Sequence, residues 1–263
     1  MFTLESKTRQ RLAPAMQRVL IVDPEPEAAR SLSDLLRQIG PCQVWTAPDG
    51  GLGADLAARI DPHILFIDHA ANGPAFVRGL RRSRLACRKA PVIMLTVEIT
   101  ARFIIEARDA GANELLRRPC TIEALWRRVE AVLLRERDWI EAVTYAGPDR
   151  RQFNVGDVGV LVKRRRDGTL SPRMARIWQA MNILHASAHY VQSNPDQALR
   201  SMLAQTDALK AAGGLGSRLN ASAVDLETWL TESDLCRVPP LEVHRRIAAL
   251  SALVLREDIA AAA

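Results

Sequence analysis

A short apolar run that ends in a carboxylate constrains the fold of this chain more than any other feature. Residues 64–69 read ILFIDH, which is typical of a buried strand of a parallel sheet that presents an acid at its carboxyl end. Residues 18–23 (RVLIVD) and 91–96 (PVIMLT) have the same build. Because such strand ends share one edge of a sheet, we expect Asp23, Asp68 and Thr96 to lie together.

Helical patterns alternate with these strands. Further short strands are predicted at 42–47 and 114–117, and apolar residues with helical spacing fill the stretches between strands and follow the last one. Five strand and helix units in about 120 residues predict an α/β fold, a doubly wound five-stranded parallel sheet with helices on both faces.

Length and composition suit a globular protein of one large or two ordinary domains. The chain has 263 residues, 25% of them charged and 48% hydrophobic, which fits about 100 to 200 residues per domain. No apolar run approaches the roughly 18 residues of a membrane span, and residues 1–17 read as a flexible tail without a signal peptide. We therefore expect a cytoplasmic protein without membrane contact. The four cysteines show no CxxC spacing, so neither a zinc site nor a disulfide framework is indicated.

At this point the motifs resemble a known family. VD at 22–23, ID at 67–68, PVIMLT at 91–96 and GANELLRRP at 111–119 resemble the receiver domain of two-component response regulators, over residues 18–135. The resemblance implies that Asp68 is the phosphoacceptor and that Asp23 belongs to an acidic pocket that binds Mg²⁺ together with Asp68. It also implies that Thr96 and Arg118 are switch residues, Arg118 standing where the family has lysine.

The sequence departs from the family at this site. Pro24 replaces the second acid of the pocket, and Leu115 stands where the family often has tyrosine. Two interpretations stay open. Asp68 accepts a phosphoryl group, with Asp23, Glu25 and water around Mg²⁺; or the domain is a pseudo-receiver used for docking, in which Arg118 pairs with Asp68 permanently.

Residues 136–170 are predicted to be a helical connector followed by an arginine-rich linker. The apolar spacing of the helix that begins near Thr121 continues to about Thr144, which fits either one long helix that leaves the receiver or a helix end with a few surface apolar residues. The linker holds a candidate anion-binding set: Arg150, Arg151, Arg164, Arg165 and Arg166. An RxxD pattern at 164–167 resembles those that bind cyclic di-guanylate, although charge runs usually remain solvated.

Residues 171–263 are predicted to form a smaller, all-helical output domain. Its segment 215–230 resembles a helix-turn-helix of the phage-repressor type, with Asn220 at the turn and Ser222 as N-cap of the second helix. Acidic residues such as Asp225 and Glu227 would repel DNA phosphates, so an interaction domain is favoured over a DNA reader. His185 and His189 are interpreted as packing residues.

Together these patterns predict a regulatory protein of a phosphorelay and no enzyme. The expected partners are a histidine kinase or phosphotransfer protein for the receiver, a protein partner for the helical domain, and a second copy of the chain in a homodimer. A DNA-binding transcriptional regulator and a cyclic di-guanylate effector remain the competing functions.

Overall fold

The computed structural model describes residue 12 and residues 14–135, 137–150, 171–212 and 217–262. The described residues form two compact units. The first, called the receiver unit below, contains the residues up to 140 together with 146–150. The second, the helical unit, contains 141–145 and the residues from 171 onward. Each unit is described by itself.

The receiver unit is built on a parallel sheet with the strand order β2-β1-β3-β4-β5. The strands are β1 (Arg18–Val22), β2 (Gln43–Ala47), β3 (Ile64–Asp68), β4 (Val92–Thr96) and β5 (Glu114–Arg117). β3 and β4 are buried along their whole length. The α/β fold predicted from the sequence is therefore confirmed, and the predicted strands agree with the structure to within one residue at each end.

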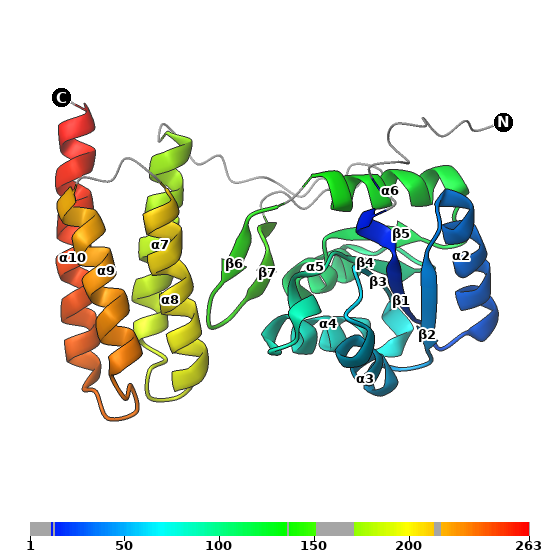
Figure 1. Ribbon diagram of the computed structural model, residues 1–263, viewed down its shortest axis with the longest axis horizontal. Helices are drawn as coiled ribbons and strands as arrows, with labels where there is room; N and C mark the ends of the chain where they lie inside the picture. The colour runs from blue at the N-terminus through cyan, green and yellow to red at the C-terminus, as the bar shows by residue number, and fades with distance from the viewer. Residues whose placement is uncertain (1–11, 13, 136, 151–170, 213–216, 263) are drawn as a thin grey trace. The chain divides into compact units, whose positions relative to one another are not determined.

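Helices cover both faces of this sheet (Figure 1). One face packs against α2 (Pro26–Ile39) and α6 (Ile122–Leu134), and the other against α3 (Gly50–Ile60), α4 (Gly73–Arg82) and α5 (Ala101–Ala110). Successive residues of β1 and β3 alternate between the two cores, as the pleat of a strand requires. Three short 3-10 helices complete this unit: η1 (Pro14–Met16), η2 (His69–Ala71) and η3 (Ala86–Lys89).

Two predictions about the segments beside the receiver are wrong. Leu12 and Met16, placed in a flexible tail, are buried in the core beneath α2 and α6. The helix expected to continue to Thr144 ends at Leu134, and the chain then forms a hairpin of β6 (Trp139–Glu141) and β7 (Ala146–Pro148). Arg137 explains the break: its guanidinium donates to the Asn113 carbonyl, 2.6 Å away, which a straight continuation of α6 would forfeit.

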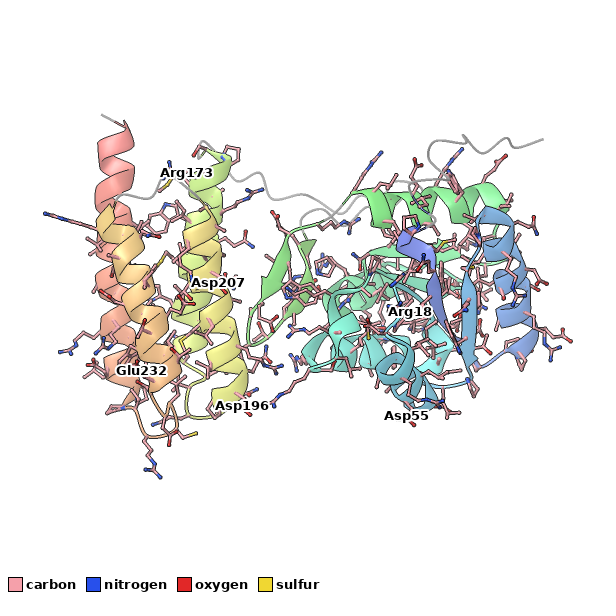
Figure 2. All side chains as sticks on the ribbon, in the orientation of Figure 1. Arg18, Asp55, Arg173, Asp196, Asp207 and Glu232 are labelled. Atoms are coloured by element: carbon pink, nitrogen blue, oxygen red, sulfur yellow. The ribbon has the colours of Figure 1, made fainter. Side chains whose placement is uncertain are left out.

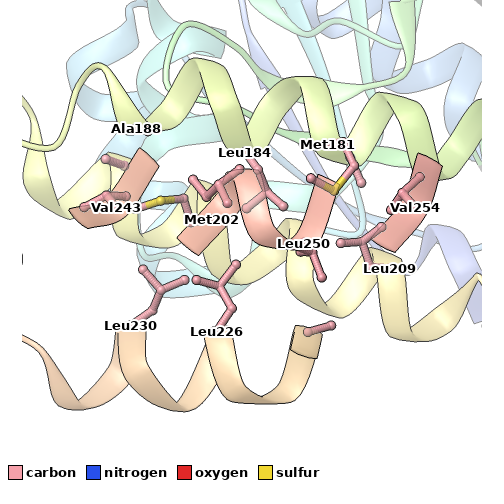
Figure 3. Packing of buried hydrophobic residues seen from close by; sticks show 14 of the residues in the cluster. Met181, Leu184, Ala188, Met202, Leu209, Leu226, Leu230, Val243, Leu250 and Val254 are labelled. Carbon is pink, nitrogen blue, oxygen red and sulfur yellow. The ribbon is translucent and has the colours of Figure 1, made fainter. Parts of the chain in front are cut away.

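The helical unit is a bundle of α7 (Pro172–Ala188), α8 (Pro195–Ala211), α9 (Ser217–Glu232) and α10 (Pro240–Ala262). Each helix packs against its two neighbours in the cyclic order α7, α8, α9, α10. Aliphatic side chains and two methionines fill the bundle core, among them Leu184, Met202, Leu226 and Leu250 (Figure 3). No helix in the described parts of the chain is both long and apolar enough to cross a membrane.

The helix-turn-helix predicted at 215–230 is wrong in its central feature. Asn220 and Ser222, the expected turn and N-cap, lie inside the uninterrupted helix α9. The physical reason is the apolar stripe of Leu219, Ala223, Leu226 and Leu230, all buried, whose helical spacing runs straight through the expected turn. Ala223, directly after the expected N-cap, is part of that core.

Candidate functional site

Three polar side chains meet at the carboxyl edge of the sheet, as the sequence predicts. Asp68 is the last residue of β3 and Thr96 the last of β4, while Asp23 directly follows β1. β1 pairs with β3 through Val22 and Ile67, so Asp23 and Asp68 are adjacent at the next position. All three are nearly inaccessible, with relative exposures of 3%, 3% and 6% in the order Asp23, Asp68 and Thr96. Carboxylates buried this deeply require compensating partners.

Arg118 supplies that compensation for both acids at once. Its Nη1 donates to Asp23 Oδ2 and its Nη2 to Asp68 Oδ2, so one guanidinium bridges the two carboxylates. Its backbone N–H donates to the Thr96 carbonyl at 2.7 Å, and the Arg118–Pro119 peptide is cis. The planar fork of an arginine suits this double contact, which the compact ammonium of a lysine would not reproduce.

The remaining carboxylate oxygens are held by backbone groups. Asp23 Oδ1 accepts from the N–H of Glu25 at 2.9 Å, and Asp68 Oδ1 accepts from the N–H of Ala70 at 2.7 Å. Every oxygen of the two carboxylates thus accepts a hydrogen bond, two from the backbone and two from Arg118. The two acids and the guanidinium sum to a charge of −1.

The pKa of Asp68 reflects two opposing influences. Burial raises the pKa of this carboxyl above its usual value of 3.8, and the Ala70 N–H and the Arg118 guanidinium act in the opposite direction. The net direction is upward, so desolvation outweighs the cation at this site.

Two neighbouring side chains are engaged elsewhere. The Thr96 hydroxyl donates to the Glu98 carbonyl at 2.8 Å and accepts from the Glu98 N–H at 3.3 Å. The exposed ring of His69 stands edge-on to Phe103, with centroids 4.9 Å apart, and its Nε2 lies 3.7 Å from Glu106 Oε2. The His69–Glu106 contact is not evident from the sequence, because nothing in the sequence indicates how α5 is rotated relative to β3.

Other predicted site residues do not join this cluster. Glu25 contributes its backbone N–H while its side chain is exposed. Leu115 is buried in the core. Arg150 forms an ion pair with Asp109 at 3.1 Å in the receiver unit. The rest of the candidate anion-binding set, Arg151 and Arg164 to Arg166, lies outside the described residues.

The residues at this edge do not fit a Mg²⁺ ion as they stand. Mg²⁺ in proteins is usually held by one or two carboxylates with several waters, and here Arg118 occupies one oxygen of each acid. Pro24 offers no side-chain oxygen. Among the described residues, no group of three or more His, Cys, Asp or Glu side chains is arranged to hold a metal ion.

Comparison with known proteins identifies the receiver unit. Residues 19–130 match the model of the response regulator receiver domain, a domain that typically binds Mg²⁺ at its phosphorylation site. The probable chemotaxis protein CheY of Rhizobium etli is 32% identical over 118 residues, which are 44% of this chain and 91% of that protein. Protein PilH of Pseudomonas aeruginosa is 30% identical, with 45% of this chain and 98% of that protein covered.

Some relatives match over only half of their own length. The transcriptional regulator RpaA of Synechocystis is 32% identical over 46% of this chain and 50% of its own length. Among solved structures, the chemotaxis response regulator CheY4 of Vibrio cholerae is similar at 27% identity with a TM-score of 0.42, covering 45% of this chain and 99% of that one. Through its receiver unit, this chain belongs to the response regulator receiver domain family.

Proposed function

We propose that this response-regulator-like protein uses its receiver as a phosphorylation-independent docking module, in which Arg118 takes the place of the metal ion. The observation that supports this function best is the Arg118 bridge, which together with two backbone N–H groups satisfies every oxygen of Asp23 and Asp68. The helical unit then serves as the output that contacts a protein partner.

The energetics of phosphoryl transfer support this function. Asp68 would attack phosphorus with an oxygen that already accepts a strong hydrogen bond, while three anionic phosphoryl oxygens approach two buried carboxylates. Mg²⁺ normally neutralises that charge, but it would first have to displace a guanidinium that bridges both acids. A site with one acid fewer than the family pattern attracts Mg²⁺ more weakly.

The acids keep a role without phosphorylation. Arg118 joins the ends of β1 and β3 to the turn after β5, which are the segments that shape this edge of the sheet. Receiver domains of response regulators interact with histidine kinases or phosphotransfer proteins. For this chain we infer that such a protein binds the fixed surface without transferring a phosphoryl group.

The decisive experiment is phosphorylation by acetyl phosphate with and without Mg²⁺, read by intact mass. The wild type and Asp68→Asn are expected to show no adduct. The matched positive control is Pro24→Asp combined with Arg118→Lys, which restores the family's acid and ammonium. That variant is expected to gain one Mg²⁺-dependent phosphoryl group, which is lost again when Asp68→Asn is added.

A phosphoryl group on the wild type that requires Mg²⁺ and disappears in Asp68→Asn would contradict the proposal. It would establish the second candidate function, a phosphorylated response regulator with Asp68 as phosphoacceptor. The location of Asp68 and Thr96 on adjacent strand ends is the observation that favours that alternative.

A further inference from the structure

The segment that follows the candidate site carries an unbalanced positive charge. Residues 69–97 contain no Asp or Glu and six basic residues. Arg81 is buried, and the other five are exposed or half-exposed on α4, on η3 and on the turn between them. These five side chains are called the α4–η3 cationic surface: Arg78, Arg82, Arg84, Arg88 and Lys89.

The fold holds this surface in a fixed shape. The guanidinium of Arg81 donates from Nη1 to the Arg88 carbonyl at 2.6 Å and to the Ala90 carbonyl at 2.7 Å, which fastens the backbone of η3. The cationic groups of Arg88 and Lys89 lie 5.4 and 5.7 Å from the ring centroid of Trp139. A surface ordered before binding loses less side-chain entropy when a partner is bound.

The acids of α5 and the acid that follows α3 pair with arginines outside this surface. On α5, which packs against α4, Glu106 and Asp109 each form an ion pair with an arginine of the same helix, at 2.8 and 2.9 Å. Asp61, which follows α3, pairs with Arg18 at 3.3 Å. Asp55 projects from α3 into solvent (Figure 2). Within the described residues, Arg78 and Arg84 have no ion-pair partner.

The surface also lacks the apolar side chains that anchor a protein interface. None of the large exposed hydrophobic side chains in the described parts of the chain belongs to α4, to η3 or to the turn between them, and Val97, the one within residues 69–97, follows β4. Energetic centres of protein interfaces, and helices that insert into membranes, need such residues. Arginine forks without apolar anchors suit phosphate oxygens, which they bind through two parallel hydrogen bonds.

We propose that the α4–η3 cationic surface binds the phosphate backbone of nucleic acid without reading its sequence. This binding would be a second activity, carried by the receiver unit and independent of the Arg118 site. This surface differs from the two anion-binding regions that the sequence suggested, the arginine-rich linker and the helical domain, where the exposed face of α9 includes the acid Asp225.

The expected salt dependence follows from the number of cations. The four fully exposed members, Arg78, Arg82, Arg84 and Lys89, set an upper limit of four neutralised phosphates. At about 0.9 counterions released per phosphate, this limit corresponds to an affinity for duplex DNA that falls by at most about 150-fold between 50 and 200 mM salt.

The test is fluorescence anisotropy of the full chain with a labelled DNA duplex across that salt range. Replacing the four residues by Gln should abolish the salt-dependent binding, and the double variant Arg78→Gln/Arg84→Gln should halve the logarithmic slope. The matched control removes an equal number of positive charges from exposed positions outside this surface. In it, four arginines are each changed to Gln: Arg30, Arg37, Arg218 and Arg245. It should retain the wild-type slope.

Three results would overturn the proposal. The first is no binding by the wild type at the lowest salt. The second is loss of binding when Arg164, Arg165 and Arg166 become Gln, with binding unchanged in the α4–η3 variants. The third is equal affinity for poly-glutamate, which would replace nucleic acid by acidic protein as the partner. Asp68→Asn should bind like the wild type, which separates this test from that of the Arg118 site.

Discussion

Removing the guanidinium of Arg118 is the most informative perturbation of this protein. Arg118→Ala would leave Asp23 and Asp68 adjacent, with side-chain exposures of 0% and 4% and no cation between them. Breaking a buried ion pair by deleting one partner costs about 3–5 kcal/mol of unfolding free energy. Arg118→Lys keeps the positive charge but loses the planar guanidinium that contacts both acids. We therefore expect it to lower the unfolding free energy by about half as much as Arg118→Ala.

Mg²⁺ should distinguish the variant from the wild type. Without Arg118, one oxygen of each acid becomes available, and Mg²⁺ at ten times its dissociation constant would restore about 1.4 kcal/mol. The wild type should gain nothing, because Arg118 already occupies those oxygens. The loss should also shrink from about pH 8 toward about pH 5. Removing the cation raises the pKa of Asp68 further, so the folded state takes up a proton that relieves the repulsion.

These differences in unfolding free energy can be measured by urea unfolding, followed by tryptophan fluorescence in a variant whose tryptophans all lie in the receiver unit. Replacing Trp178 and Trp229 by Phe leaves the fluorescence of Trp45, Trp126 and Trp139. Equal stabilisation of the wild type and Arg118→Ala by Mg²⁺ would refute the idea that Arg118 stands in for the metal. If Arg118→Ala lost less than about 1 kcal/mol of unfolding free energy, the loss would be that of a surface ion pair. Such a result would also refute the idea that Arg118 compensates the two buried carboxylates.

Three further predictions test other parts of the structure by urea or thermal unfolding. Gly73→Ala places a Cβ 2.6 Å from the Asp68 carbonyl oxygen and should lower the unfolding free energy by about 1–3 kcal/mol. Gly79→Ala, at a helical position with open space around it, should instead raise the unfolding free energy by up to about 1 kcal/mol. Equal effects of the two substitutions would contradict the steric argument. Glu114→Gln removes the charge of a buried carboxylate that pairs with two partly buried arginines and should cost about 3 kcal/mol; a neutral result would contradict this expectation. Burial and two nearby imidazoles lower the pKa of His185 below 6.5. The helical unit should therefore lose stability as the pH falls through about 6.5, and His185→Gln should weaken that pH dependence. An unchanged pH profile in this variant would contradict the prediction.

The strands were predictable because each is a short apolar run with a clear end. β3 and β4 are buried on both faces, so their sequences are almost purely hydrophobic and stop at Asp68 and Thr96. Boundaries that depend on tertiary contacts were not predictable. The apolar spacing beyond Leu134 is compatible with a longer helix, and only the return of Arg137 to the start of β5 ends it there.

The helical unit shows how local turn signals can mislead. Asn220 and Ser222 are residues that favour turns and N-caps, but they occupy the outer side of a helix whose inner stripe is continuous. Burial of Leu219 and Leu226 in one core outweighs these local preferences, because each buried leucine contributes about 1.5–3 kcal/mol.

At the candidate site, the sequence identified the participants but only part of their arrangement. Asp23, Asp68 and Thr96 follow from strand ends, and pairing of Arg118 with Asp68 was one of two expectations. The contact of the same guanidinium with Asp23 depends on how the turn after β5 approaches β1, from which β5 is separated by β4 and β3. The engagement of the Thr96 hydroxyl with Glu98 is likewise set by the conformation of its own loop.

The replacements at 24 and 118 make physical sense together. Losing the acid at position 24 removes one negative charge and one oxygen, which weakens a metal site, and a guanidinium at position 118 restores what the metal would have supplied to the two remaining acids. Unlike Mg²⁺, Arg118 cannot leave, and it stays charged throughout the physiological pH range. Under the proposed docking function, a receiver built this way would have no ligand-dependent state of its own at this edge. Regulation would then require a partner that binds two arrangements of the chain with different affinities, through surfaces other than the Asp23–Asp68 pocket.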